Sequence, residues 1–149
     1  SIENYCTPIL VLNKWDLLNE EDKLNINSNL KIQLKKFSWL NVIRISALTT
    51  KGLNKFSKTL NEVNSQLNNR IDTSDLNLYF RELWVAKPPH PFRGKRAKLK
   101  YVTQYDISPP SFSFNLSSRI PKNYYSFIEN KLREEFGFKN VSLKIKYKT

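Results

Sequence analysis

The sequence has no methionine, one cysteine and three glycines among its 149 residues, and it has no long apolar run. The single cysteine, Cys6, excludes an internal disulfide framework and is typical of a reducing compartment. The longest apolar run, Ile9–Leu12, is far shorter than the roughly 20 residues that a membrane-spanning helix needs. No signal peptide is visible. We therefore expect no membrane partner.

The scarcity of glycine also limits the chemistry. Gly52, Gly94 and Gly137 cannot supply the phosphate-binding pattern G-x-x-x-x-G-K-[ST], and no D-x-x-G occurs. Without these patterns the chain has no phosphate cradle, no magnesium ligands and no switch loops. His90 has no second metal ligand or nucleophile near it in the sequence. We predict no catalytic residue and no metal site, and we expect no hydrolysis of GTP by this chain alone.

Acidic residues are also few. Thirteen Asp and Glu stand against 25 Lys and Arg, which gives a net charge of +12. Residues 1–72 carry ten basic and seven acidic side chains, and residues 73–149 carry fifteen and six. Such an excess favours phosphate-bearing partners, because each neutralised phosphate releases counterions. The alternative is a solvated, lysine-rich surface that reflects biased base composition.

Residues 1–72 predict part of an α/β sheet. Strand signals at Ile9–Leu12 and Val42–Ile45 flank a polar stretch and a helix predicted over Leu30–Phe37. After Gly52, apolar residues at spacings of three and four predict a second helix with the face Leu53, Phe56, Leu60, Val63 and Leu67. Strand, helix, strand, helix is typical of a parallel sheet. Two strands do not bury both faces of a sheet, so we interpret this segment as half of a larger domain.

Residues 73–149 predict a separate α+β module. Its first helix is capped by Thr73 or Ser74, and the stiff connector KPPHPFRGKR follows it. Pro121 opens a later helix, which Gly137 ends. The predicted order is helix, strand, strand, helix, strand, over residues 74–83, 97–105, 112–116, 121–136 and 141–148.

Asn13, Lys14 and Asp16 follow the first predicted strand in the pattern N-K-x-D, which fits the guanine-recognition loop of P-loop GTPases. A carboxylate such as Asp16 accepts hydrogen bonds from N1–H and the exocyclic amine of guanine at once. Adenine would leave it unpaired, which costs about 1–3 kcal/mol for a buried polar group. Asn13 would bridge the loop and the purine edge, and the methylene stem of Lys14 would lie over the base.

A second loop supports the same prediction. Ser46 and Ala47 follow the next predicted strand in RISALTTKG, 33 residues after Asn13. We expect the backbone N–H of Ala47 to donate to guanine O6 and Ser46 to brace the loop. Ligands of open α/β folds bind at the carboxyl ends of the strands. The two loops together predict a site for GTP or GDP, with Mg²⁺ expected only where the phosphate-binding half is present.

On these motifs the sequence resembles the Der family, also called EngA, of bacterial GTPases with two tandem G domains and a C-terminal KH-like domain. VLNKWDLL and ISALTTKG are similar to the fourth and fifth guanine-binding motifs of its second G domain. Successive segments of its terminal domain are similar to RIDTSDLN, PPHPFRGKRAKLKYVTQ, PPSFSFN and YYSFIENKLREEFGF. The resemblance implies the rear half of a P-loop GTPase sheet over residues 1–72, followed by an α+β KH-like domain over residues 73–149.

The resemblance also implies a function. The chain would be the C-terminal part of a GTPase that binds the large ribosomal subunit and its rRNA under GTP control and acts in the biogenesis of that subunit. Its other partners would be the first and second G domains of the same full-length chain. The location would be the bacterial cytoplasm, or the equivalent compartment of an endosymbiont or organelle. The residues that contact guanine would be Asn13, Lys14, Asp16, Ser46 and Ala47.

Two other interpretations stay open. An Era-like GTPase also joins a G domain to a KH domain, but it should carry a G-x-x-G loop, and the sequence has none. The chain would otherwise be a non-catalytic RNA- or protein-binding KH-like remnant without GTPase activity. The absence of a phosphate-binding loop is a direct expectation of that second interpretation.

The basic residues of the second module have several interpretations. A KH domain holds RNA with its G-x-x-G loop, so that contact is not available to this sequence. The basic residues would contact ribosomal RNA phosphates, dock a G domain, or simply be solvated: Lys95, Arg96, Lys98, Lys100, Lys144, Lys146 and Lys148. Base stacking is a further role for aromatic residues here, but at alternating spacing they are more often core: Tyr101, Tyr105, Phe112 and Phe114.

Overall fold

The computed structural model describes residues 5–149, so residues 1–4 of the predicted first domain lie outside the described residues. The chain folds into two compact units, Ser1–Ser65 and Gln66–Thr149. No helix in the part of the chain that the structure describes is long and apolar enough to cross a bilayer. Within residues 5–149, four α-helices and two sheets give the mixed α/β fold that the sequence predicts.

The second unit begins before the predicted domain boundary at residues 72 and 73. Hydrogen bonds hold the preceding segment to the second unit: the Gln66 Oε1 accepts the N–H of Asn140 at 2.9 Å, and the side chain of Gln104, only 3% exposed, makes two more. The Gln104 Oε1 accepts a hydrogen bond from the N–H of Ile71 at 2.8 Å, and its Nε2 donates to the carbonyl of Asn69 at 2.9 Å. These bonds attach the segment before the third helix to the second unit.

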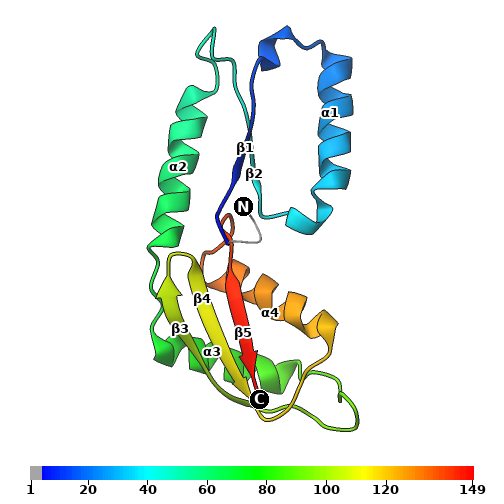
Figure 1. The fold of residues 1–149 in the computed structure, drawn as a ribbon, viewed down its shortest axis with the longest axis vertical. Helices are drawn as coiled ribbons and strands as arrows, with labels where there is room; N and C mark the ends of the chain where they lie inside the picture. The colour runs from blue at the N-terminus through cyan, green and yellow to red at the C-terminus, as the bar shows by residue number, and fades with distance from the viewer. Residues whose placement is uncertain (1–4) are drawn as a thin grey trace. The chain divides into compact units, whose positions relative to one another are not determined.

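In the first unit, strands β1 (Ile9–Leu12) and β2 (Asn41–Arg44) lie side by side between helices α1 (Glu20–Gln33) and α2 (Leu53–Leu67) (Figure 1). The strands pair in parallel, from Ile9 opposite Asn41 to Leu12 opposite Arg44. The predicted order of strand, helix, strand, helix is therefore confirmed. The carboxyl ends of both strands lie at the same edge of this small sheet.

Helix α1 begins ten residues earlier than the helix predicted over Leu30–Phe37. Asn19 caps it, because the Asn19 Oδ1 accepts the N–H of Asp22 at 2.8 Å. The acidic first turn, Glu20 to Asp22, suits the positive end of the helix dipole. The predicted last turn is a separate 3₁₀ helix, Lys35–Phe37. Apolar periodicity alone therefore missed the polar first half of this helix.

The second unit contains α3 (Thr73–Ala86), β3 (Leu99–Ile107), β4 (Pro110–Leu116), α4 (Lys122–Glu135) and β5 (Lys144–Lys148). The sheet order is β3-β4-β5, with β3 and β4 antiparallel and β4 and β5 parallel. Both helices lie on one side of this sheet (Figure 1). The predicted order of helix, strand, strand, helix, strand is confirmed.

An aromatic core fills the space between these helices and the sheet. Phe80 of α3 is fully buried, and its ring centroid lies 4.9 Å from that of Phe114 and 5.2 Å from that of Tyr79. Phe112 is also fully buried, and its ring centroid lies 5.5 Å from that of Phe138. The two phenylalanines of β4 are therefore core residues, as their alternating spacing predicts.

The last strand is shorter than predicted, because Arg133 binds the backbone that precedes it. The buried guanidinium donates to the carbonyls of Phe138 at 3.0 Å and Val141 at 2.7 Å. Burial lowers the pKa of Arg133, and its ion pair with Glu129 at 2.7 Å acts in the opposite direction. Residues 141–143 are buried but do not join the sheet, and β5 begins at Lys144.

Candidate functional site

Two loops at the carboxyl ends of β1 and β2 enclose a cavity of about 330 Å³. This volume lies near the lower end of the range typical of small-molecule sites. All the residues that the two sequence motifs assign to guanine line the cavity: Asn13, Lys14, Asp16, Ser46 and Ala47. The parallel pairing of β1 and β2 brings these loops together, although 33 residues separate Asn13 from Ser46.

Asn13 joins the two loops. Its Oδ1 accepts the N–H of Lys14 at 2.8 Å and the N–H of Ala47 at 3.1 Å. Lys14 has a left-handed backbone, with φ of 59°, and this turns the chain into a short 3₁₀ helix, Trp15–Leu17. The amide that the prediction assigns to guanine O6 is therefore hydrogen-bonded to Asn13. A bound base would have to share or replace that bond.

Ser46 braces the second loop from inside. It is 2% exposed, and its Oγ accepts the N–H of Thr49 at 3.2 Å. Its own N–H donates to the carbonyl of Lys51 at 2.9 Å. The loop then turns through Thr50 and Gly52, both with positive φ. A β-branched residue rarely adopts this conformation, so the loop holds Thr50 in a strained backbone.

Trp15, at the variable position of the N-K-x-D pattern, does not line this cavity. Its N–H donates to the carbonyl of Ile45 at 3.1 Å, and the Arg44 guanidinium lies 5.2 Å from its ring centroid. Arg44 in turn donates from Nε to the Oδ1 of Asn27 at 3.0 Å. Trp15 therefore holds the first loop against the end of β2 and α1.

The side chains that would meet a ligand are open to solvent. Asn13, Lys14 and Asp16 are exposed, and among residues 5–149 no hydrogen-bond or ion-pair partner is assigned to the Asp16 carboxylate. Leu17 and Leu48 also line the cavity, and Leu48 is 89% exposed. Sequence reasoning gave these leucines no role, because an apolar residue in a loop has no recognisable ligand chemistry. The only available signal was their position beside the two motifs.

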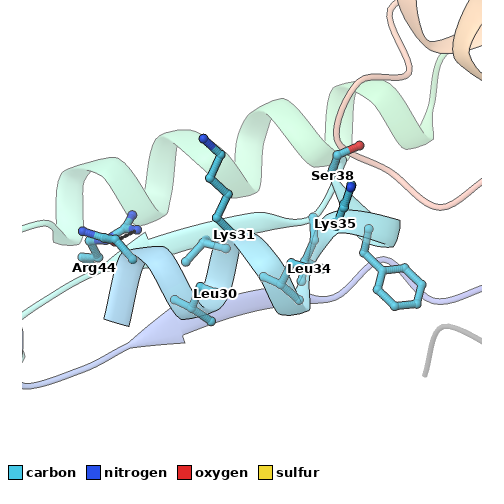
Figure 2. A pocket seen from close by; sticks show the side chains of 10 residues that line it. Leu30, Lys31, Leu34, Lys35, Ser38 and Arg44 are labelled. Atoms are coloured by element: carbon cyan, nitrogen blue, oxygen red, sulfur yellow. Dashed lines mark hydrogen bonds between the residues drawn. The ribbon is translucent and has the colours of Figure 1, made fainter. Parts of the chain in front are cut away.

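A larger cavity of about 410 Å³ lies elsewhere in the first unit, between α1 and β2. Figure 2 shows Leu30 and Leu34 on successive turns of the helix, with Lys31 and Lys35 projecting from the same segment. Its lining is mainly apolar and basic, includes the polar Asn27 and Ser38, and contains no carboxylate. It therefore lacks the group that would select guanine.

The predicted basic residues lie in the connector before β3, in β3 and in β5. Lys146 and Lys148 line a shallow cavity on the outer side of the second sheet, together with Tyr101 and Tyr105. The other predicted basic residues do not line it: Lys95, Arg96, Lys98, Lys100 and Lys144. Val102 and Gln104 are buried, and Tyr101 and Tyr105 alternate with them on the outer face. The core interpretation is therefore wrong for Tyr101 and Tyr105, which are 48% and 42% exposed.

Comparison with known proteins identifies relatives of both units. A family model described as the KH-domain-like domain of EngA bacterial GTPase enzymes, C-terminal, matches residues 70–148. The chain is 34% identical over 143 residues to the GTPase Der of Chlorobium limicola, covering 93% of this chain and 33% of that protein. It is 31% identical over 137 residues to the GTPase Der of Mycolicibacterium vanbaalenii, covering 92% of this chain and 29% of that protein.

The GTPase Der of Corynebacterium glutamicum is similar to the same extent, with 32% identity over 138 residues, 92% of this chain and 26% of that protein. The chain thus spans about a third or less of the length of these curated relatives. The matches extend well beyond residues 70–148, so they include the loops around the 330 Å³ cavity.

Proposed function

The chain belongs to the EngA (Der) family of bacterial GTPases, and from this membership we propose that its first unit binds the guanine base of GTP or GDP while its second unit contacts the large ribosomal subunit. In this proposal the chain corresponds to the C-terminal region of a Der GTPase that acts in large-subunit biogenesis in the cytoplasm. The phosphates and Mg²⁺ would be held by G-domain segments that this sequence does not contain.

One observation carries the guanine proposal. Two loops far apart in the sequence line a single cavity with a solvated carboxylate, an amide side chain and a backbone N–H. Asp16 would accept both donors of the guanine edge, and Asn13 would hold the loops in register. Leu17 and Leu48 would cover the faces of the base, and burying the exposed Leu48 side chain would favour binding.

The test exchanges one hydrogen-bonding group. Xanthine carries a carbonyl where guanine carries its exocyclic amine, so Asp16→Asn should shift the preference from guanosine towards xanthosine by roughly tenfold or more. Binding of the two nucleosides to the chain is measured by NMR, from the chemical shift of the Ala47 amide. Nucleosides suit the chain because they do not require a phosphate site.

Asp22→Asn is the matched control, since Asp22 is an exposed carboxylate in the first turn of α1 and does not line the cavity. It should leave the guanosine preference unchanged. If Asp16→Asn keeps full guanosine preference, or if adenosine shifts the Ala47 amide as strongly as guanosine does, Asp16 does not read the base and the proposal is wrong.

The ribosomal part of the proposal is supported by the basic character of the second unit and by family membership. Charge reversal at Lys144, Lys146 and Lys148 to Glu should weaken co-sedimentation with large subunits and reduce its dependence on salt, because phosphate contacts release counterions. Reversal of Lys31, Lys35 and Lys36 in the first unit provides a control with the same change in charge. Equal co-sedimentation of both variants across a salt series would contradict the proposal.

A further inference from the structure

The outer face of the β3-β4-β5 sheet combines exposed aromatic rings with lysines. Tyr101 and Tyr105 of β3 and Lys146 and Lys148 of β5 line a cavity of about 170 Å³ on this face. We call these four residues the tyrosine–lysine face. The opposite side of the same strands forms the core, where Val102, Phe112 and Phe114 are fully buried.

The two rings are placed to meet separate ligand groups. Tyr101 and Tyr105 are four residues apart on one strand, which corresponds to roughly 13 Å at the rise of an extended chain. They are therefore too far apart to enclose a single planar group between them. Their exposed fractions, 48% and 42%, leave ring surface available for stacking. A base has a flat apolar surface on each side, so stacking of this kind is tolerant of sequence.

Positive charge lies next to the rings. The Lys146 Nζ lies 5.1 Å from the ring centroid of Tyr105, and Lys148 stands opposite Asn115 in the register of β4 and β5. No acidic residue lines the cavity, as the described residues around it show. The lysines would therefore attract a phosphate chain that runs along β5 while its bases reach β3.

The floor between the rings and the lysines is small and polar. It is formed by Thr103, Ser113 and Asn115. Ser113 is 5% exposed, and its Oγ has no hydrogen-bond partner among the residues that the structure describes. Because this oxygen is buried, a ligand in the cavity meets the half-buried side chains of Thr103 and Asn115 instead.

We propose that the tyrosine–lysine face binds an unpaired segment of RNA, with bases stacked on Tyr101 and Tyr105 and phosphates held by Lys146 and Lys148. The choice of RNA rests on the proposed ribosomal function. Exposed aromatic rings beside a basic strand fit single-stranded nucleic acid better than a duplex, whose bases are already stacked on one another.

An acidic protein surface is the alternative partner. Lysines alone would serve such a partner, whereas the two open rings would remain unexplained. The contribution of the rings therefore separates the two partners, and the experiment measures it directly.

The test uses the full 149-residue chain and a short fluorescein-labelled single-stranded RNA of mixed sequence, with the same sequence annealed into a duplex as the second ligand. Fluorescence anisotropy gives the two affinities. Tyr101→Leu and Tyr105→Leu should each weaken single-strand binding roughly tenfold. Tyr101→Phe and Tyr105→Phe should keep most of it, because the ring remains. Lys148→Ala should reduce the salt slope by about one.

Lys122→Ala is the control for loss of one charge, because Lys122 is exposed at the start of α4 and does not line the cavity. The Phe variants control for folding, since they retain the ring that a Leu variant removes. Three results would each overturn the inference. The first is equal affinity for single strand and duplex, and the second is an equal loss of single-strand affinity in Tyr105→Leu and Lys122→Ala. The third is binding of polyglutamate in place of RNA.

Co-sedimentation of the wild-type chain with large ribosomal subunits separates this inference from the proposed function. If the wild-type chain binds subunits but no single-stranded RNA, the inference is wrong and the ribosomal function stands. If it binds single-stranded RNA through the rings but no subunits, the inference stands and the ribosomal function is wrong.

Discussion

The two units of the chain differ in what holds them together. Of the seventeen buried apolar side chains among residues 5–149, only Ile43 and Val63 belong to the first unit. Exposed apolar residues are frequent there, for example Ile32 at 74% and Leu48 at 89%. Turns and hydrogen bonds such as those of Asn13 and Ser46 shape its cavity. Core substitutions should therefore affect the second unit most, and backbone substitutions should affect the first.

The largest expected effect is a core truncation in the second unit. Phe80→Ala removes a fully buried ring that packs on Phe114 and Tyr79, and it should lower the free energy of unfolding by about 3–5 kcal/mol. Urea unfolding followed by circular dichroism measures this change. Leu60→Ala in the first unit is the control, because Leu60 is 44% exposed. Similar losses in both variants would contradict the comparison.

The next effect concerns a buried charge in the second unit. Arg133→Ala leaves the carbonyls of Phe138 and Val141 without their donors and should cost about 2–3 kcal/mol of unfolding free energy. Lys131→Ala breaks an exposed ion pair with Glu134 on the same helix and should have little effect. Thermal unfolding of the two variants distinguishes a structural arginine from a surface charge. Equal melting temperatures would show that the arginine does not stabilise the segment before β5.

A backbone substitution should instead affect the first unit. Gly52 has φ of 87°, and an added Cβ would lie 2.4 Å from the carbonyl oxygen of Arg44. Gly52→Ala should therefore cost about 2 kcal/mol or more, since the clash adds to the left-handed backbone. Gly94 also has positive φ, but no atom lies within 4 Å of an added Cβ, so Gly94→Ala serves as the control.

Hydrogen exchange of residues 41–48, followed by mass spectrometry, measures this effect. Gly52→Ala should accelerate exchange in that segment and reduce the guanosine-induced shift of the Ala47 amide. Gly94→Ala should change neither result. If both glycine variants behave alike in this segment, the close approach to Arg44 is not what positions the second loop.

The smallest effect is expected from removing either of two tyrosine hydroxyls in the second unit. The Tyr124 hydroxyl donates to the carbonyl of Lys87 at 2.6 Å, whereas the buried Tyr147 hydroxyl has no partner among residues 5–149. Tyr124→Phe should cost about 1 kcal/mol, and Tyr147→Phe should be neutral or slightly stabilising. Chemical denaturation at neutral pH measures the pair. A larger loss of unfolding free energy in Tyr147→Phe than in Tyr124→Phe would contradict the assignment of the hydrogen bond to Tyr124.

The contribution of the same two tyrosines to stability depends on pH. Burial raises the pKa of Tyr124 to about 12 from the ordinary 10.0, so the folded chain keeps a proton that the unfolded chain loses in this interval. Stability should therefore fall as the pH rises from about 10 to about 12. Tyr124→Phe removes this contribution and should flatten the loss. Burial also raises the pKa of Tyr147, so Tyr147→Phe should flatten it as well.

Alternation and helical spacing predicted most of the second unit, because its elements are amphipathic. Phe112 and Phe114 face the core as the alternation predicts. The exposure of Tyr101 and Tyr105 was not predicted, because alternation separates them from Val102 and Gln104 but does not show which side of the strand meets the helices. A tyrosine is compatible with either side, since its ring is apolar and its hydroxyl is polar.

The candidate site was predictable where polar residues form a recognisable pattern. The N-K-x-D and S-A segments supplied Asn13, Asp16 and Ala47, and the structure places all three around one cavity. Leu17 and Leu48 were missed because their position depends on how the loops fold. The hydrogen bond from the Ala47 amide to Asn13 was also missed, since the sequence does not reveal which acceptor a loop amide meets.

The unpaired side of β1 has a consequence for handling the chain. Ile9–Leu12 pairs with β2 on one side, and within the described residues no strand pairs with the other. This strand carries no charge, whereas the edge strand β5 carries Lys144, Lys146 and Lys148. A neutral, apolar edge promotes pairing between molecules, and lysines oppose it. We therefore expect aggregation of the isolated chain to begin at β1, so that solubility will depend on Val11 and its neighbours rather than on the high net charge.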